Sequence, residues 1–247
     1  MIKYIILGII QGLTEFLPVS SSAHLVIMQK VLGISSQQVV LTIVLHLGTL
    51  LALAVFFFKD ILNTLRNARL VLLIIIVTAI TGVIGIFGKD FFIGLFSSIR
   101  SVAFALIITG IILIMSKRFK ETKGSAISIK DAVIFGLTQG FAIIPGISRS
   151  GITISTLLFR GLDRKTAFRF SFIASIPAVF GAVLLEAKDI SCALNIDLKN
   201  FAIGFTASFL SGIFALYTLR IILNKTRFYY FGYYCILVAL AALVFLR

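Results

Sequence analysis

The sequence predicts an all-α polytopic membrane protein, folded as a single membrane domain over residues 1–247. Hydrophobic residues make up 60% of the chain and charged residues 13%, and this charged share is about half that of a typical soluble protein. Several apolar runs have the roughly 20 residues that a helix needs to cross the hydrocarbon core. A polar, serine-containing segment also occurs in each half of the chain, at matching positions. Together these observations predict two related halves embedded in lipid.

Six apolar runs are expected to form full transmembrane helices. They follow an N-terminal segment that resembles a signal peptide but is interrupted by Glu15 and Pro18. No small-residue cleavage site follows that segment, so we expect it to be retained. The six runs are residues 39–58, 70–88, 101–115, 170–185, 201–219 and 229–243.

Basic residues are concentrated in short loops between the apolar runs. Lys and Arg number 23 against nine Asp and Glu, yet they do not line one face as they would for nucleic acid, so we expect no nucleic-acid partner. By the positive-inside rule four basic loops are cytoplasmic, and both chain termini then lie on the outer side. Their basic residues are Lys59, Arg66 and Arg69; Lys117, Arg118, Lys120, Lys123 and Lys130; Arg160, Arg164, Lys165 and Arg169; and Arg220, Lys225 and Arg227.

An internal repeat is visible when the chain is shifted by 128 residues. Gln11 then falls on Gln139, and the serine triplet 20–22 falls on residues 148–150. Each half contains a re-entrant helical hairpin followed by three spans, and because three is odd the second repeat is inverted relative to the first. Chance similarity of apolar sequence is the alternative. The prediction is six full spans, two hairpins and about ten helices, with a first repeat at 1–123 (hairpin 1–33) and an inverted second repeat at 124–247 (hairpin 131–159).

The first hairpin carries a carboxylate at a depth where charge is costly. Glu15 is the only acidic residue before Asp60, and a charge near the bilayer centre costs about 3 kcal/mol, so such groups are usually partnered and functional. An interfacial Glu15 without a role is the alternative. Gln11 lies one helical turn earlier on the same face. Ser21 and His24 are three residues apart, so on a helix the imidazole can approach the hydroxyl as a base approaches a nucleophile.

Both hairpins have a proline followed by hydroxyl-bearing residues, beginning at Pro18 and Pro145. A serine there can cap the next helix, whose unpaired N–H groups form an anion site suited to phosphate. Serines that act only as caps and small packing residues are the alternative. Arg149 adds a planar, permanently charged fork that fits phosphate, although an ion pair with Glu15 would also explain it. For His46, inside an apolar run, we favour a buried, hydrogen-bonded role over a role in the site.

These residues resemble the undecaprenyl-diphosphate phosphatase family, which is linked to bacitracin resistance. Its Glu/Gln-x-x-x-Glu pattern stands here as Gln11-Gly-Leu-Thr-Glu15, and its Pro-Gly-x-Ser-Arg-Ser-x-x-Thr pattern is complete from Pro145 to Thr153. The resemblance implies an enzyme of the bacterial plasma membrane that hydrolyses undecaprenyl diphosphate to undecaprenyl phosphate, recycling the lipid carrier of peptidoglycan synthesis.

The resemblance also implies site residues and a cofactor. It implies a divalent cation, Mg²⁺ or Ca²⁺, with Glu15 as a metal ligand. Gln11 stands where the acidic form of the motif has a Glu. A metal would therefore depend on the Glu15 carboxylate, hydroxyls, waters and the substrate's phosphates. The expected catalytic residues are Glu15, Ser21, His24 and Arg149, and the expected substrate-binding residues are Gln11, Ser20, Ser22, Gly146, Ser148, Ser150 and Thr153.

Several alternatives remain at the level of the sequence. The nucleophile is either Ser21 or a water that His24 activates. A lipid-phosphate transporter or flippase is the alternative function, because inverted repeats with broken helices are typical of secondary carriers. The acid-phosphatase-like membrane family is disfavoured, because its second His motif and its Lys-x6-Arg-Pro element are absent from the sequence. Cys192 and Cys235 match no metal or redox spacing, and a homodimer is compatible with the sequence.

Overall fold

The computed structural model describes residues 1–33, 38–96, 98–119, 122, 124–188, 198–225 and 227–245. The secondary structure in these ranges is helical, apart from one isolated β-bridge between Gly124 and Leu162. The all-α prediction is therefore confirmed. Of the residues named above, Lys120, Lys123 and Cys192 lie outside the described ranges.

Helices occupy all six predicted spans. Within the described ranges, five of them are long and apolar enough to cross a membrane. The sixth, α12, has 16 residues and is about 24 Å long at 1.5 Å per residue, short of a ~30 Å hydrocarbon core. The helices are α3 Gln38–Phe56, α5 Ala68–Phe87, α7 Ile99–Met115, α10 Arg164–Lys188, α11 Leu198–Asn224 and α12 Tyr230–Phe245.

Two pairs of shorter helices occupy the predicted hairpins. A serine caps the second helix of each pair: the Ser20 hydroxyl oxygen accepts from the N–H of Ala23, and that of Ser148 accepts from the N–H of Gly151. The turn after each proline and the capping serine therefore define where each hairpin breaks. The pairs are α1 Ile2–Phe16 with α2 Ser21–Val31, and α8 Ile129–Phe141 with α9 Arg149–Phe159.

Within the described ranges, the structure adds short helices to the six predicted spans and the two predicted hairpins. They are α4 Phe58–Leu65, α6 Lys89–Phe96 and a 3-10 turn at Ser116–Arg118. None exceeds eight residues, so none contains the long apolar run on which span prediction depends. α4 lies in the first basic loop, where Asp60 forms an ion pair with Arg169 near the start of α10.

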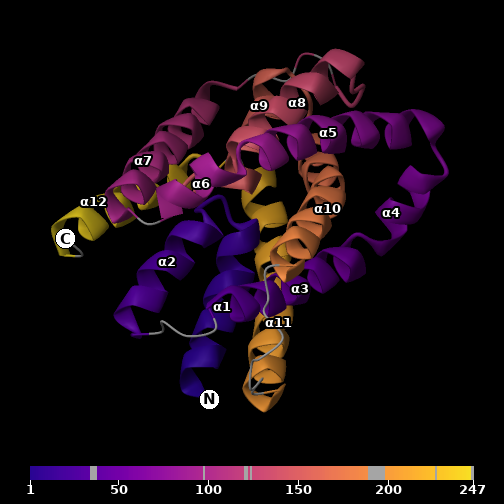
Figure 1. Cartoon of the computed structure of the whole chain (residues 1–247). Coiled ribbons are helices and arrows are strands. Elements are labelled where there is room, and N and C mark those ends of the chain that lie inside the picture. Colours follow the sequence, from indigo (N-terminus) through magenta and orange to yellow (C-terminus); the bar gives the residue numbers. More distant parts are fainter. Residues whose placement is uncertain are drawn as a thin grey trace.

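Helices of the two halves interleave (Figure 1). α1 of the first half lies along α11 of the second, and α8 of the second half lies along α5 of the first. α3 contacts both α10 and α11, and α7 packs against α12. Each hairpin is thus supported by a long helix from the opposite half of the chain.

Small residues let α1 approach α11 closely. A Cβ added at Gly12 would lie 2.3 Å from the carbonyl oxygen of Ser208 and 2.7 Å from the backbone nitrogen of Gly212. Only glycine leaves room for backbones this close, and small residues are typical of helix contacts in membranes. This contact positions the helical turn that carries Gln11 and Glu15.

A buried ion pair closes the base of the second hairpin. Ser128 caps α8 and exchanges hydrogen bonds with Asp131, whose other carboxylate oxygen accepts from Nε of Arg160 at 2.7 Å. Asp131 is fully buried, so loss of its partner would leave an uncompensated charge. Because Arg160 directly follows α9, the pair ties the start of α8 to the end of α9 and sets the direction of α9.

Candidate functional site

The tips of the two hairpins meet. The Ser22 hydroxyl oxygen accepts a hydrogen bond at 3.4 Å from the N–H of Gly146, 124 residues away in the sequence. In the other direction, the Ser150 hydroxyl donates to the carbonyl oxygen of Leu17 at 3.3 Å. The polar segments of both halves therefore form one site.

Each tip contains a residue with an unusual backbone conformation. Ser20 has φ 67° and ψ 97° and is the one non-glycine residue with positive φ in the described chain. Such a conformation costs about 1–3 kcal/mol and persists where the surroundings impose it. Gly146 has φ 100°, and a Cβ added there would lie 2.3 Å from the carbonyl oxygen of Val102. The second tip is therefore packed against α7 at a position that only glycine fits.

Glu15 is the centre of the site. Its Oε1 accepts from Nη2 of Arg149 at 2.6 Å, and its Oε2 accepts from the Ser21 hydroxyl at 2.6 Å. Gln11 donates to Oε2 at 3.1 Å, and Nε2 of His46 lies 3.7 Å from the same oxygen. The side chain of Glu15 is 7% exposed and that of Arg149 is 16% exposed, so water screens their attraction weakly. One carboxylate thus joins the hydroxyl of the first hairpin to the guanidinium of the second.

Two buried atoms beside Glu15 have no hydrogen-bond partner among the described residues. They are Nη1 of Arg149, which is a donor, and Oε1 of Gln11, which is an acceptor. Leaving a buried polar group unpaired costs about 1–3 kcal/mol, and a bound ligand is one way to pair it. The guanidinium fork can hold Glu15 with one amino group and offer the other to a phosphate oxygen.

His24 is hydrogen-bonded to partners other than Ser21. Its Nδ1 is 2.8 Å from the carbonyl oxygen of Ser20, and its Nε2 is 2.9 Å from the hydroxyl of Tyr234. The His24 and Tyr234 rings also stack, with centroids 5.7 Å apart and planes 3° apart. Helical spacing predicted an approach of His24 to Ser21, but the Ser21 hydroxyl donates to Glu15 instead. The tight turn between the helices brings the first residue of α2 against the last turn of α1.

The hydroxyl-bearing residues expected to contact substrate are hydrogen-bonded within the protein. The hydroxyls of Ser20 and Ser148 cap α2 and α9, and those of Ser22 and Ser150 join the two tips. Within each tip, the two serine hydroxyls also lie within hydrogen-bond distance of each other. Thr153 donates to the carbonyl oxygen of Arg149 at 2.6 Å and lies 2.7 Å from the Ser171 hydroxyl. These hydroxyls therefore have a structural role. A ligand that binds them must replace their present hydrogen bonds.

Besides Ser171 on α10, further residues contact the site from helices that the motifs do not include. His46 on α3, for which we favoured a role outside the site, reaches Glu15. Tyr234 on α12 reaches His24, and Thr109 on α7 donates to the carbonyl oxygen of Gly146 at 2.9 Å. Their polarity within apolar runs is the available sequence signal, because only helix packing brings them to the hairpins.

The oxygen atoms of the site are compatible with a divalent cation. Among the described residues, no group of three His, Cys, Asp or Glu side chains could hold a metal ion. Glu15 supplies one carboxylate, and Gln11 supplies an unpaired amide oxygen one helical turn away. Mg²⁺ is often held by one or two protein groups together with waters and substrate phosphates. The residues present therefore fit such an ion when a phosphate-bearing substrate completes its ligands.

The fold and the site define a multi-pass helical membrane protein with a buried, charged centre suited to a phosphate-bearing ligand. Five described helices can cross a membrane, and the charged centre joins two hairpin tips. The family model described as bacitracin resistance protein BacA matches residues 4–241. The chain belongs to this family.

Curated relatives match over almost the whole chain. An undecaprenyl-diphosphatase of Halothermothrix orenii is 43% identical over 255 residues, which is 98% of this chain and 96% of the relative. One of Carboxydothermus hydrogenoformans is 44% identical over 248 residues, with 97% and 95% covered. One of Alkaliphilus metalliredigens is 41% identical over 260 residues, with 94% of each covered. The family resemblance inferred from the two motifs is confirmed.

Proposed function

We propose that the protein hydrolyses undecaprenyl diphosphate to undecaprenyl phosphate and inorganic phosphate, and so recycles the lipid carrier of cell-wall synthesis. The relatives bear the name of this activity. The observation that carries the proposal is the carboxylate of Glu15, with the Ser21 hydroxyl and the Arg149 guanidinium each 2.6 Å away. A nucleophile, a base and a phosphate clamp are the parts that this chemistry needs.

Ser21 is the proposed nucleophile. Its oxygen attacks the terminal phosphorus while its proton passes to Oε2 of Glu15, to which it already donates a hydrogen bond. The bond from the terminal phosphorus to the bridging oxygen breaks, and undecaprenyl phosphate leaves. Water then hydrolyses the phosphoserine, which releases inorganic phosphate and restores the hydroxyl. Water activation by His24 has less support, because both of its ring nitrogens are hydrogen-bonded elsewhere.

Arg149 is the proposed clamp on the terminal phosphoryl group. In this proposal its buried, unpaired Nη1 donates to a phosphate oxygen, while Nη2 keeps its bond to Glu15. A fixed, poorly hydrated donor stabilises the charge that spreads over the phosphoryl oxygens in the transition state. Mg²⁺ or Ca²⁺, held by Glu15 and Gln11, would neutralise phosphate charge when bound.

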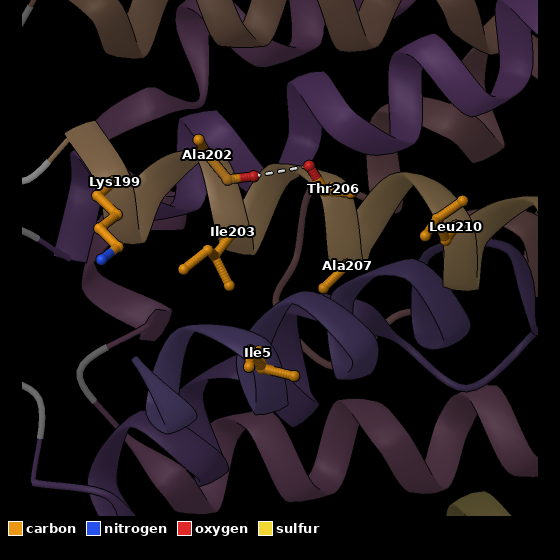
Figure 2. A pocket seen from close by; sticks show the side chains of 7 residues that line it. All are labelled: Ile5, Lys199, Ala202, Ile203, Thr206, Ala207 and Leu210. Carbon is orange, nitrogen blue, oxygen red and sulfur yellow. Dashed lines mark hydrogen bonds between the residues drawn. The ribbon is translucent and has the colours of Figure 1, made fainter.

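An apolar groove beside α1 suits the prenyl chain. It has a volume of about 530 Å³ and lies between α1 and α11 (Figure 2). Thr206 in its wall donates to the carbonyl oxygen of Ala202 at 2.8 Å, so that hydroxyl is satisfied within the helix. Ile5 in the groove precedes Glu15 by ten residues, which is about 15 Å along α1. A prenyl chain that leaves the site along α1 would reach this groove.

The proposed topology is an inverted repeat of residues 1–123 and 124–247, with α12 as the sixth span and both termini outside the cell. The register of the repeat and the exchanged packing of α1 on α11 and α8 on α5 support it. In a cysteine-free background, a membrane-impermeant maleimide should label Ile2→Cys but not Lys130→Cys on intact bacteria; the reverse would reject this orientation.

Light scattering of the purified protein distinguishes one chain from a homodimer.

Release of inorganic phosphate distinguishes the proposed hydrolysis from the alternative function, lipid transport. Purified protein in detergent, given undecaprenyl diphosphate and Mg²⁺ or Ca²⁺, should release inorganic phosphate, and the Glu15→Gln variant should not. A lipid-phosphate transporter or flippase with the same cleft would move the lipid but leave the diphosphate intact. Absence of release with either ion, from wild-type protein that shows a cooperative thermal unfolding transition, would reject the proposal.

A further inference from the structure

A second pocket lies apart from the hairpin tips, where α3 and α4 meet the start of α10 and the end of α11. Its volume is about 470 Å³, and four basic side chains line it. One carboxylate, Asp60, shares the lining and is paired with Arg169. The pocket therefore carries excess positive charge. Its basic residues are Arg164, Lys165, Arg169 and Arg220.

Buried aromatic side chains form the floor of this pocket. Phe57 and Phe168 are 1% and 4% exposed, and their rings lie 5.4 Å apart. Both rings contact Phe172, which packs edge-on against Phe16, the neighbour of Glu15. A preformed apolar floor below a basic rim fits a ligand with an anionic head and an apolar body.

Exposed apolar side chains continue from the pocket along the surface. Tyr217 and Ile221 flank Arg220 on α11 and are 56% and 54% exposed, and Phe58 beside the floor is 60% exposed. On a membrane protein such side chains are suited to contact with lipid. The basic residues of the pocket belong to two of the basic loops that the positive-inside rule places on the cytoplasmic side, where basic pockets between helices suit acidic lipid headgroups.

We propose that this pocket binds the phosphodiester headgroup of an anionic phospholipid. Lys165 and Arg220 contact the phosphate, Arg169 adds charge while it keeps its bond to Asp60, and the acyl chains lie along the exposed apolar side of α11. Free inorganic phosphate shares the charge but has no apolar part that would contact the exposed side chains of α11. The pocket contains none of the residues proposed for hydrolysis, so this inference does not rest on the proposed function.

Lipid titration of purified full-length protein tests the proposal. Dioleoylphosphatidylglycerol, added to protein in a neutral detergent, should raise the midpoint of thermal unfolding, because a ligand that binds the folded state stabilises it. Dioleoylphosphatidylcholine carries the same phosphate without net charge and should not. In the double variant Lys165→Gln/Arg220→Gln the apparent affinity for the anionic lipid should fall about 30-fold, since each basic side chain near an anionic surface contributes about fivefold.

The matched control is Arg66→Gln/Lys130→Gln, which removes the same charge from exposed positions outside the pocket. It should bind the anionic lipid as wild type does, and both double variants should keep wild-type phosphate release. Equal weakening in the control, equal stabilisation by the choline lipid, or unchanged binding in the pocket variant would overturn the proposal. A stabilisation by inorganic phosphate that is lost in the pocket variant would overturn the lipid assignment in favour of free phosphate.

Discussion

Replacement of Arg149 by Lys isolates what the guanidinium fork contributes. Arg149 bonds Glu15 through Nη2 and has a second buried amino group, Nη1, with no partner in the described chain. A Lys ammonium keeps the charge but occupies one position, so it serves either Glu15 or the phosphate. The variant therefore loses one transition-state donor, worth about 2.7–4 kcal/mol, and kcat should fall about 10²–10³-fold. Phosphate release from undecaprenyl diphosphate, measured over a range of substrate concentrations in detergent, gives kcat and KM.

Arg160→Lys is the matched control for this prediction. Arg160 bonds Asp131 at 2.7 Å and lies 11 residues after Arg149, about 16 Å away along the same helix direction. Its kcat should stay within about twofold of wild type, because Arg160 contacts no proposed reacting group and the Lys ammonium keeps a positive charge beside buried Asp131. If the kcat of Arg149→Lys were within about threefold of wild type, this would refute the proposal that one guanidinium binds Glu15 and the phosphate at the same time.

Three further changes test other parts of the site. Ser21→Ala should abolish phosphate release yet retain substrate binding, seen as a thermal shift on adding substrate; near-normal turnover would favour water as the nucleophile. His46→Leu should lower kcat about tenfold through loss of a polar partner of Glu15, whereas His46→Gln should retain most activity; equal rates for both would argue against that contact. Gly146→Ala should lower the free energy of unfolding by about 2–5 kcal/mol, because its Cβ would lie 2.3 Å from the Val102 carbonyl oxygen at a positive φ. Gly82→Ala, with nothing within 4 Å of its added Cβ, should be neutral or slightly stabilising, and thermal unfolding in detergent compares the two.

The sequence was sufficient to locate five helices that can cross a membrane and the two pairs of shorter helices that carry the polar tips, because polar residues stand out in apolar sequence. A carboxylate at Glu15 and a guanidinium at Arg149 are costly inside apolar stretches, so their presence marks a site. The structure brings these two side chains into contact. An ion pair with Glu15 was the alternative explanation for Arg149. The short helices α4 and α6 were missed, because segments of eight residues are too short to be recognised by the length of an apolar run.

Contacts across turns and between distant helices could not be predicted in the same way. Helical spacing paired Ser21 with His24, whereas the turn between α1 and α2 places the hydroxyl on Glu15, six residues earlier. The internal repeat also predicts the helices of the second half better than the hydrogen-bond partners of their side chains. Gln139, the counterpart of Gln11, donates to Thr81 on α5 at 3.1 Å and not to a site carboxylate.

A double-mutant cycle on Glu15 and Arg149 tests most directly whether the two hairpins form one catalytic unit. The variants Glu15→Gln, Arg149→Met and their combination would be compared by kcat/KM for phosphate release from undecaprenyl diphosphate. Because the two side chains share one hydrogen bond at 2.6 Å, each single change should cost about 10²-fold or more, and the double variant should be little worse than the poorer single variant. Multiplied losses in the double variant would show two independent contributions and contradict the account.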